Sequence, residues 1–236
     1  GNGLGAVEEH IFESNPIRII GQPDIDGWHF TYTDIARNLA IVNLANNIGQ
    51  YGFTLRAVMY SYTDSLANIL PKNNDCYDSS PKFEEQAKTI ICTGYEFSYS
   101  HNAFDDELDE IVYSWGEPLG VAFSYDPTNP NATALLFDPP YTVNSPIPGN
   151  PTLESSTGEI TYNSNTPGVF VTCIKVEAFK CGQLVAEIYR EVQVLLIDCG
   201  LYTQPIDGFN DPPTITEAFT DPATGLPTYE TTVYAG

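Results

Sequence analysis

The sequence predicts an all-β protein made of tandem immunoglobulin- or cadherin-like β-sandwich modules. Apolar and polar residues alternate along most apolar segments, with the two-residue period of a strand that buries one face. Aromatic residues, which favour strands, make up 12% of the 236 residues, and a hydrophobic content of 42% is enough for a packed core. Helical periodicity is weak: its best stretch, 33–46, is short and interrupted by β-branched residues.

Residues 1–79 are expected to form the first β-sandwich module. Its clearest strands are 28–33 and 51–60, in which alternate residues share an apolar face: Trp28, Phe30 and Tyr32 in the first, and Phe53, Leu55, Ala57 and Met59 in the second. The chain turns polar between 68 and 80 and becomes apolar again after Pro81. Because domain boundaries fall in such polar stretches, we place the end of the module there.

Residues 80–199 are expected to form a second module of the same type, centred on a long hairpin. Segments 169–179 and 184–197 flank a three-residue loop, Cys181-Gly182-Gln183, of the kind that joins antiparallel strands. Pairing 178 with 186, and so on to 170 with 194, separates an apolar face from a charged one. The apolar face consists of Phe170, Ile174, Val176, Ala178, Ala186, Ile188, Val192, Val194 and Leu196, and the charged face of Lys175, Glu177, Glu187, Glu191 and Gln193. Segments 95–99, 111–115 and 120–125 supply strands for a covering sheet.

Residues 200–236 have the composition of a linker followed by the opening strands of a further module. Pro205, Pro212 and Pro213 stiffen the linker, and segments 215–219 and 229–234 are the expected strands. Because this stretch is too short to build a core, we expect the chain to be one segment of a longer repeat array.

The net charge excludes two classes of partner. The chain has 9 Lys and Arg against 31 Asp and Glu, which gives a formal charge of −22. Such a surface cannot replace the counterions of DNA or RNA, and anionic lipid repels it. No stretch approaches the roughly 20 apolar residues of a membrane span. We therefore expect no nucleic-acid partner and no direct membrane insertion.

An ordered series of short motifs runs along the chain. It includes Ser80-Pro-Lys-Phe83, Ile91-Cys-Thr-Gly94, His101-Asn-Ala103, Arg190-Glu-Val-Gln193 and Asp198-Cys199, with Gly27-Trp28 and Arg37-Asn38 upstream. This series resembles the repeated extracellular modules of giant Bacteroidota cell-surface adhesins, the SprB-type gliding-motility adhesins. Two positions depart from the family pattern: Ile35 and Ala36 stand where the family often has a Cys pair, and Leu108 stands where it often has Gly.

The resemblance implies a non-catalytic function. Proteins of this family are exported by the type IX secretion system, which implies an extracellular location at the cell surface. The implied role is cell adhesion, stalk structure in a surface filament, or gliding motility. The implied partners are neighbouring modules of the same chain and a surface polysaccharide or another cell-surface component.

The densest acidic cluster contains the candidate metal ligands, Asp105, Asp106, Glu107 and Asp109. Close carboxylates supply the hard oxygen ligands that Ca²⁺ prefers. Asp75 and Asp78 are possible extra ligands in the preceding polar stretch, and Asp207 and Asp211 hold the equivalent place before the next module. Leu108 makes the required tight turn harder than Gly would. The alternative is a solvated acidic loop that binds no cofactor.

Five cysteines without a Cys-x-x-Cys pair favour disulfides over a zinc site and indicate an oxidising compartment. In a sandwich of the predicted kind, the first strand ends near Cys92, and the last strand, parallel to it, ends near Cys199. We therefore predict a Cys92–Cys199 disulfide. Cys76 and Cys181 share the opposite pole and form a second predicted pair, which leaves Cys173 free. Reduced thiols throughout are the alternative.

The remaining candidate sites concern sugars. Ser65, in Asp64-Ser-Leu66, and Asn131, in Asn131-Ala-Thr133, match short glycosylation signals. Trp28 and Trp115, with Tyr60, Tyr62, Tyr99 and Tyr125, offer a stacking surface, although aromatic side chains in sandwiches more often pack in the core. The alternative function is accordingly a carbohydrate-binding module of a secreted enzyme. A glycoside hydrolase using Asp126, Asp138 and Glu154 is the least supported alternative, because no catalytic motif accompanies these residues.

Overall fold

The computed structural model describes residues 11–35, 37–45, 52–64, 78–87, 90–120, 133–199, 219–220 and 227–228. Every regular element in these residues is a strand, which confirms the all-β prediction, and none of them forms a helix that could cross a membrane. The strands are β1 (Trp28–Asp34), β2 (Phe53–Met59), β3 (Lys82–Phe83), β4 (Ile90–Cys92), β5 (Glu96–Ser100), β6 (Ala103–Phe104), β7 (Glu110–Trp115), β8 (Leu119–Gly120), β9 (Thr133–Ala134), β10 (Thr152–Leu153), β11 (Glu159–Asn163), β12 (Gly168–Lys180), β13 (Gln183–Ile197), β14 (Phe219–Thr220) and β15 (Pro227–Thr228).

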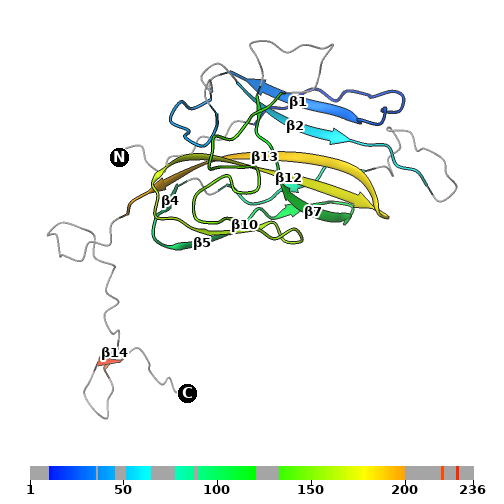
Figure 1. Cartoon of the computed structure of the whole chain (residues 1–236). Coiled ribbons are helices and arrows are strands. Elements are labelled where there is room, and N and C mark those ends of the chain that lie inside the picture. Colours follow the sequence, from blue (N-terminus) through cyan, green and yellow to red (C-terminus); the bar gives the residue numbers. More distant parts are fainter. Residues whose placement is uncertain are drawn as a thin grey trace, which may run out of the picture. The chain divides into compact units, whose positions relative to one another are not determined.

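The long hairpin of β12 and β13 forms the centre of unit 1–199 (Figure 1). Its register pairs Phe170 with Val194 and Ala178 with Ala186, as the alternation predicts. The expected three-residue loop is instead a two-residue turn, Cys181-Gly182, in which both residues have positive φ angles of 50° and 76°. A bulge just before the turn absorbs the extra residue, so the predicted register is kept.

The main core lies between this hairpin and a smaller sheet. Strands β10, β11 and β5 form a three-stranded antiparallel sheet, and Ile160 and Tyr162 of β11 pack in one apolar cluster with the hairpin. Every residue predicted for the apolar face of the hairpin is at most 8% exposed. At the base of the hairpin, β4 adds to the end of β13 in parallel, with Cys92 opposite Ile197.

The boundary expected near residue 79 does not separate two sheets. Strand β1 pairs with β2 along its whole length, and β2 pairs in turn with β13 through Ala57, Val58 and Met59. The first 79 residues therefore add strands to the sheet of the expected second module. The physical reason is that the edge of β13 away from β12 has open hydrogen-bonding groups, which β2 satisfies. The chain divides into compact units at 1–199 and 200–236, the position of the second expected boundary.

In unit 200–236 the structure describes one antiparallel pair, β14 with β15, in which Phe219 lies opposite Thr228. Apart from Phe219, the strands expected at 215–219 and 229–234 lie outside the described residues.

The charged face of the hairpin is partly covered. The eight-stranded sheet of the described residues runs in the order β7-β12-β13-β2-β8-β9, with β1 and β4 joined at the side. Strand β8 follows β7 closely in the chain, yet it pairs with β2, two strands beyond β12. The sheet must therefore curl, and Glu187 and Cys173 on this face are 6% exposed or less. Val171 on the same face packs against Ile41 and Leu44.

Candidate functional site

The predicted metal-binding cluster lies in the turn between β6 and β7. Asp105 organises this turn, because its Oδ1 accepts the backbone N–H groups of Glu107 at 3.0 Å and Asp109 at 3.1 Å. Leu108 adopts a positive φ of 61°, so the turn expected to need glycine forms with leucine. Asp105 is only 2% exposed, and its Oδ2 has no hydrogen-bond partner among the described residues.

A second segment, residues 78–79, completes the cluster. Glu107 Oε2 accepts hydrogen bonds from the Ser79 backbone N–H at 3.1 Å and from the Ser79 hydroxyl at 2.7 Å, and the hydroxyl bond lowers the pKa of Glu107. One carboxylate oxygen each from Asp78, Asp105 and Glu107 lies within 4.8 Å of the other two. These residues are the possible metal ligands that the structure brings together, and Asp78 belongs to the preceding stretch that the sequence singles out.

Asp106 and Asp109, the other two predicted ligands, lie differently. Asp106 forms an exposed ion pair with Lys82 and is not among the carboxylates brought together. Asp109 instead shares Lys180 with Asp78, since the ammonium lies 3.5 Å from Asp109 Oδ2 and 3.4 Å from Asp78 Oδ1. Burial and then the Asp109 carboxyl raise the pKa of Asp78 to about 7, although Lys180 opposes the shift. Asp75, Asp207 and Asp211 lie outside the described residues.

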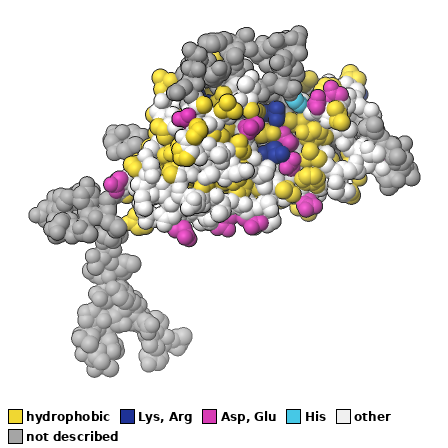
Figure 2. Space-filling model, in the orientation of Figure 1, with side chains coloured by type: hydrophobic (Ala, Val, Ile, Leu, Met, Phe, Trp, Pro, Cys, Tyr) yellow, Lys and Arg dark blue, Asp and Glu magenta, His cyan; other side chains and the backbone are white. Residues whose placement is uncertain are grey.

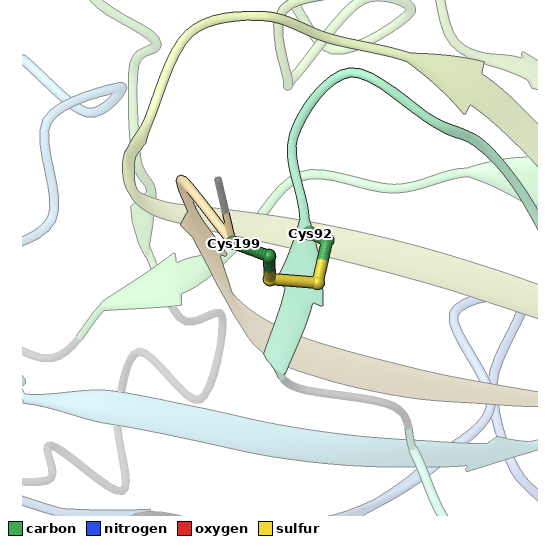
Figure 3. Close-up of a disulfide and its surroundings, with 2 residues drawn as sticks. All are labelled: Cys92 and Cys199. Carbon is green, nitrogen blue, oxygen red and sulfur yellow. A yellow bond between two sulfur atoms is a disulfide. The ribbon is translucent and has the colours of Figure 1, made fainter. Parts of the chain in front are cut away.

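Cys92 and Cys199 form a disulfide, which is the pair expected from the sequence (Figure 3). Their Cα atoms are 5.3 Å apart, and their sequence separation is 107. The parallel pairing of β4 with the end of β13 brings the two cysteines together, because both strands end at the same side of the sheet. Thr93 N–H extends this pairing by donating to the Ile197 carbonyl at 2.8 Å.

The second predicted disulfide, Cys76–Cys181, is not formed at Cys181. Cys181 is a free, exposed thiol at the hairpin tip rather than the partner of Cys76, which lies outside the described residues. Cys181 has a left-handed backbone conformation in the two-residue turn. Cys173 is free, as expected, and buried. Burial raises the pKa of the Cys173 thiol strongly, so it is a structural and unreactive group.

Buried ion pairs fill the curled face of the sheet, and the sequence gives little sign of them. Arg37 pairs with Glu191 and donates to the Leu119 carbonyl at 2.9 Å, while Arg56 lies 3.6 Å from Glu187. The other members are Lys175, Glu177 and Tyr189. Figure 2 shows basic side chains gathered with acidic ones near the centre of one face. The alternation along the hairpin places Lys175, Glu187 and Glu191 on this face, but no local pattern predicts Arg37 and Arg56 as their partners.

The two tryptophans of the candidate stacking surface lie on strands far apart in the sheet. Strands β2, β13 and β12 separate Trp28 of β1 from Trp115 of β7, and Trp115 packs against the main core. Instead, Phe12, Phe30 and Tyr32 help to line an open groove of about 640 Å³ over β1 and β2. The rings of Phe12 and Tyr32 are in contact, with centroids 4.8 Å apart and planes tilted by 31°. The candidate residues Ser65, Asn131, Tyr125 and Asp126 lie outside the described residues.

Comparison with known proteins adds no relative: no family model, no curated protein and no solved structure matches the chain. The resemblance to surface adhesins therefore rests on the motif series alone. A functional proposal has to be built on the disulfide, the acidic cluster and the groove.

Proposed function

We propose that the chain is a non-catalytic segment of a long extracellular adhesin or surface filament, in which it supplies stalk structure and cell-surface adhesion. The observation that carries this proposal is the Cys92–Cys199 disulfide, which lies where compact unit 1–199 ends. Structural disulfides form and persist in oxidising compartments outside the cytoplasm. The bond therefore supports an extracellular or cell-surface location. Export through the type IX secretion system is what the resemblance of the motif series implies.

The position of the disulfide also supports a load-bearing role. Tension that enters the chain before Cys92 and leaves after Cys199 passes through the sulfur–sulfur bond, so the intervening segment of the chain carries none of it. Without that bond, the load would fall on β4 and β13, which are parallel neighbours, and pulling their opposite ends would load the hydrogen bonds between them together in shear. A segment of this kind keeps its length under tension, as a stalk requires.

Packing and charge support the same proposal. A three-stranded sheet packed against a larger, curled sheet is compatible with an immunoglobulin- or cadherin-like sandwich, the architecture we assign to the module. The formal charge of −22 makes neighbouring modules repel one another, which keeps a filament extended and soluble. The partners we assign are neighbouring modules and a polysaccharide or other component of the cell surface.

Protease treatment of intact producing cells tests the proposal. We expect it to release fragments of this chain, and non-reducing peptide mapping should recover the Cys92 peptide joined to the Cys199 peptide. Inactivating the type IX secretion system should abolish the release. A chain that stays protected until the cells are lysed, or that carries both cysteines reduced, would contradict the proposal.

The aromatic groove favours a second candidate function, a carbohydrate-binding module of a secreted enzyme. Phe30 is 44% exposed in a groove that also contains Tyr32 and Arg56, and sugars bind by stacking on such rings while polar groups fix their orientation. On a glycan array, this candidate predicts binding that Phe30→Ala removes and Trp115→Phe retains, because Trp115 packs against the core. Absence of glycan binding by the unaltered chain would eliminate it.

A further inference from the structure

We propose that Asp78, Asp105 and Glu107 bind one Ca²⁺ ion between the β6–β7 turn and the segment that leads into β3. One carboxylate oxygen from each residue lies within 4.8 Å of the other two. Oxygens bound to the same Ca²⁺ at about 2.3–2.6 Å can be up to about 5 Å apart. A single ion can therefore contact all three carboxylates with little movement of the protein.

A buried carboxylate oxygen without a partner distinguishes this cluster from a solvated acidic loop. Asp105 is 2% exposed, and the turn uses only its Oδ1. The Asp105 Oδ2 atom is buried and has no hydrogen-bond partner among the described residues. The Asp78 side chain is 1% exposed, and Lys180 approaches its Oδ1. A charged oxygen removed from water without a partner is costly, and a bound cation would offset that cost.

The chemistry of the cluster selects the kind of ion. All three ligand groups are carboxylates, the hard oxygen donors that favour Ca²⁺ and Mg²⁺ over Zn²⁺. The ligands come from two unconnected segments, an irregular arrangement that suits the flexible shell of six to eight oxygens around Ca²⁺. Mg²⁺ demands near-octahedral geometry and keeps several of its waters. Water molecules would complete the Ca²⁺ shell.

The local charge balance leaves room for a divalent ion. Asp109 adds a fourth carboxylate beside Asp78, and Lys180 contributes one positive charge to this pair. A Ca²⁺ ion held by Asp78, Asp105 and Glu107 would bring the group close to neutrality. The ion would fasten the segment that leads into β3 to the β6–β7 turn, beside Lys180 at the hairpin tip.

Calorimetric titration of the full chain with CaCl₂, after treatment with a chelator, tests the proposal. We expect one site per chain with a dissociation constant of about 0.1–1 mM, the range of extracellular Ca²⁺ modules. At about 100 times that concentration, the melting temperature should rise by about 5–10 °C. No binding heat and no rise in melting temperature up to about 10 mM Ca²⁺ would overturn the proposal.

Matched variants separate a defined site from general attraction to an acidic surface. Asp78→Asn should weaken Ca²⁺ binding at least about tenfold, because it removes a ligand charge without touching the hydrogen bonds of the turn. Asp106→Asn removes the same charge from the exposed neighbour that faces Lys82, and it should leave the affinity unchanged. Equal losses in the two variants would overturn the proposal. Mg²⁺ binding as tight as Ca²⁺ binding would overturn the assignment to Ca²⁺.

Discussion

Removal of the Cys92–Cys199 disulfide tests how far the stability of unit 1–199 depends on one cross-link. The bond joins residues with a sequence separation of 107. In the chain-entropy model, opening a loop of this length returns about 16 cal/mol/K to the unfolded chain, which is about 4.8 kcal/mol at 25 °C. Cys92 is half-buried and Cys199 is exposed, so a Cys92→Ser/Cys199→Ser variant loses little packing. The cross-link should therefore dominate the measured change.

Guanidinium chloride titration followed by tryptophan fluorescence measures this change. With a slope of about 4 kcal/mol/M, the midpoint of the double variant should fall by about 1 M relative to the oxidised protein. The matched control is Cys181→Ser, which should keep the original midpoint because Cys181 is a free, exposed thiol. A double variant with an unchanged midpoint, or a control with the same fall, would refute the reasoning.

Three further predictions concern single groups in the interior. Burial, and then the charge of Arg190, lower the pKa of His101 from 6.5 to about 4, so the unfolded chain takes up the proton first as pH falls. Between pH 6.5 and about 4, the free energy of unfolding of the wild type should fall by about 1.4 kcal/mol per pH unit relative to that of His101→Gln. Parallel curves of unfolding free energy against pH for the two proteins would count against this. Gly158→Ala should lower the free energy of unfolding by about 2 kcal/mol or more, because φ is 67° and the new Cβ would lie 2.5 Å from the Tyr113 ring. An unchanged melting temperature in thermal unfolding would be inconsistent with this packing. Arg37→Met should lower the free energy of unfolding measured by denaturant titration by about 3–5 kcal/mol, because it leaves Glu191 buried without its partner. The double variant that adds Glu191→Leu should recover most of this stability.

The strands and register of the β12–β13 hairpin could be predicted from the sequence, whereas its two-residue turn and the adjoining bulge could not. Each strand has a two-residue period and one apolar face, so a slip of one residue would move Phe170 and its neighbours to the charged face. The module boundary could not be predicted in the same way. It depends on β2 pairing with β13, and no local pattern shows which distant strand fills an open edge.

The charged face of the hairpin shows a second limit of local patterns. Alternation correctly separates Glu187 and Glu191 from the apolar core, but it cannot tell water from a second layer of protein. That distinction depends on the curl of the sheet, which arises because β8 pairs with β2. Arg37 and Arg56 then supply the partners that these carboxylates need.

The acidic cluster was predictable by residue type but not by orientation. Carboxylate density identifies Asp105 and Glu107, whereas the direction of Asp106 is decided by the dihedral angles of the turn. Leu108 shows a local side-chain interaction overriding a backbone preference, because the two N–H groups bound by Asp105 hold the turn in a conformation that leucine disfavours.

Single-molecule pulling on the chain between two reference domains tests the central claim, that the module keeps its length under tension. In the oxidised protein, unfolding should release no length from the segment between Cys92 and Cys199, whose sequence separation is 107. With a reductant present, that segment should add about 350–390 Å, at about 3.3–3.6 Å per residue. Release of the same length with and without the reductant would contradict the claim.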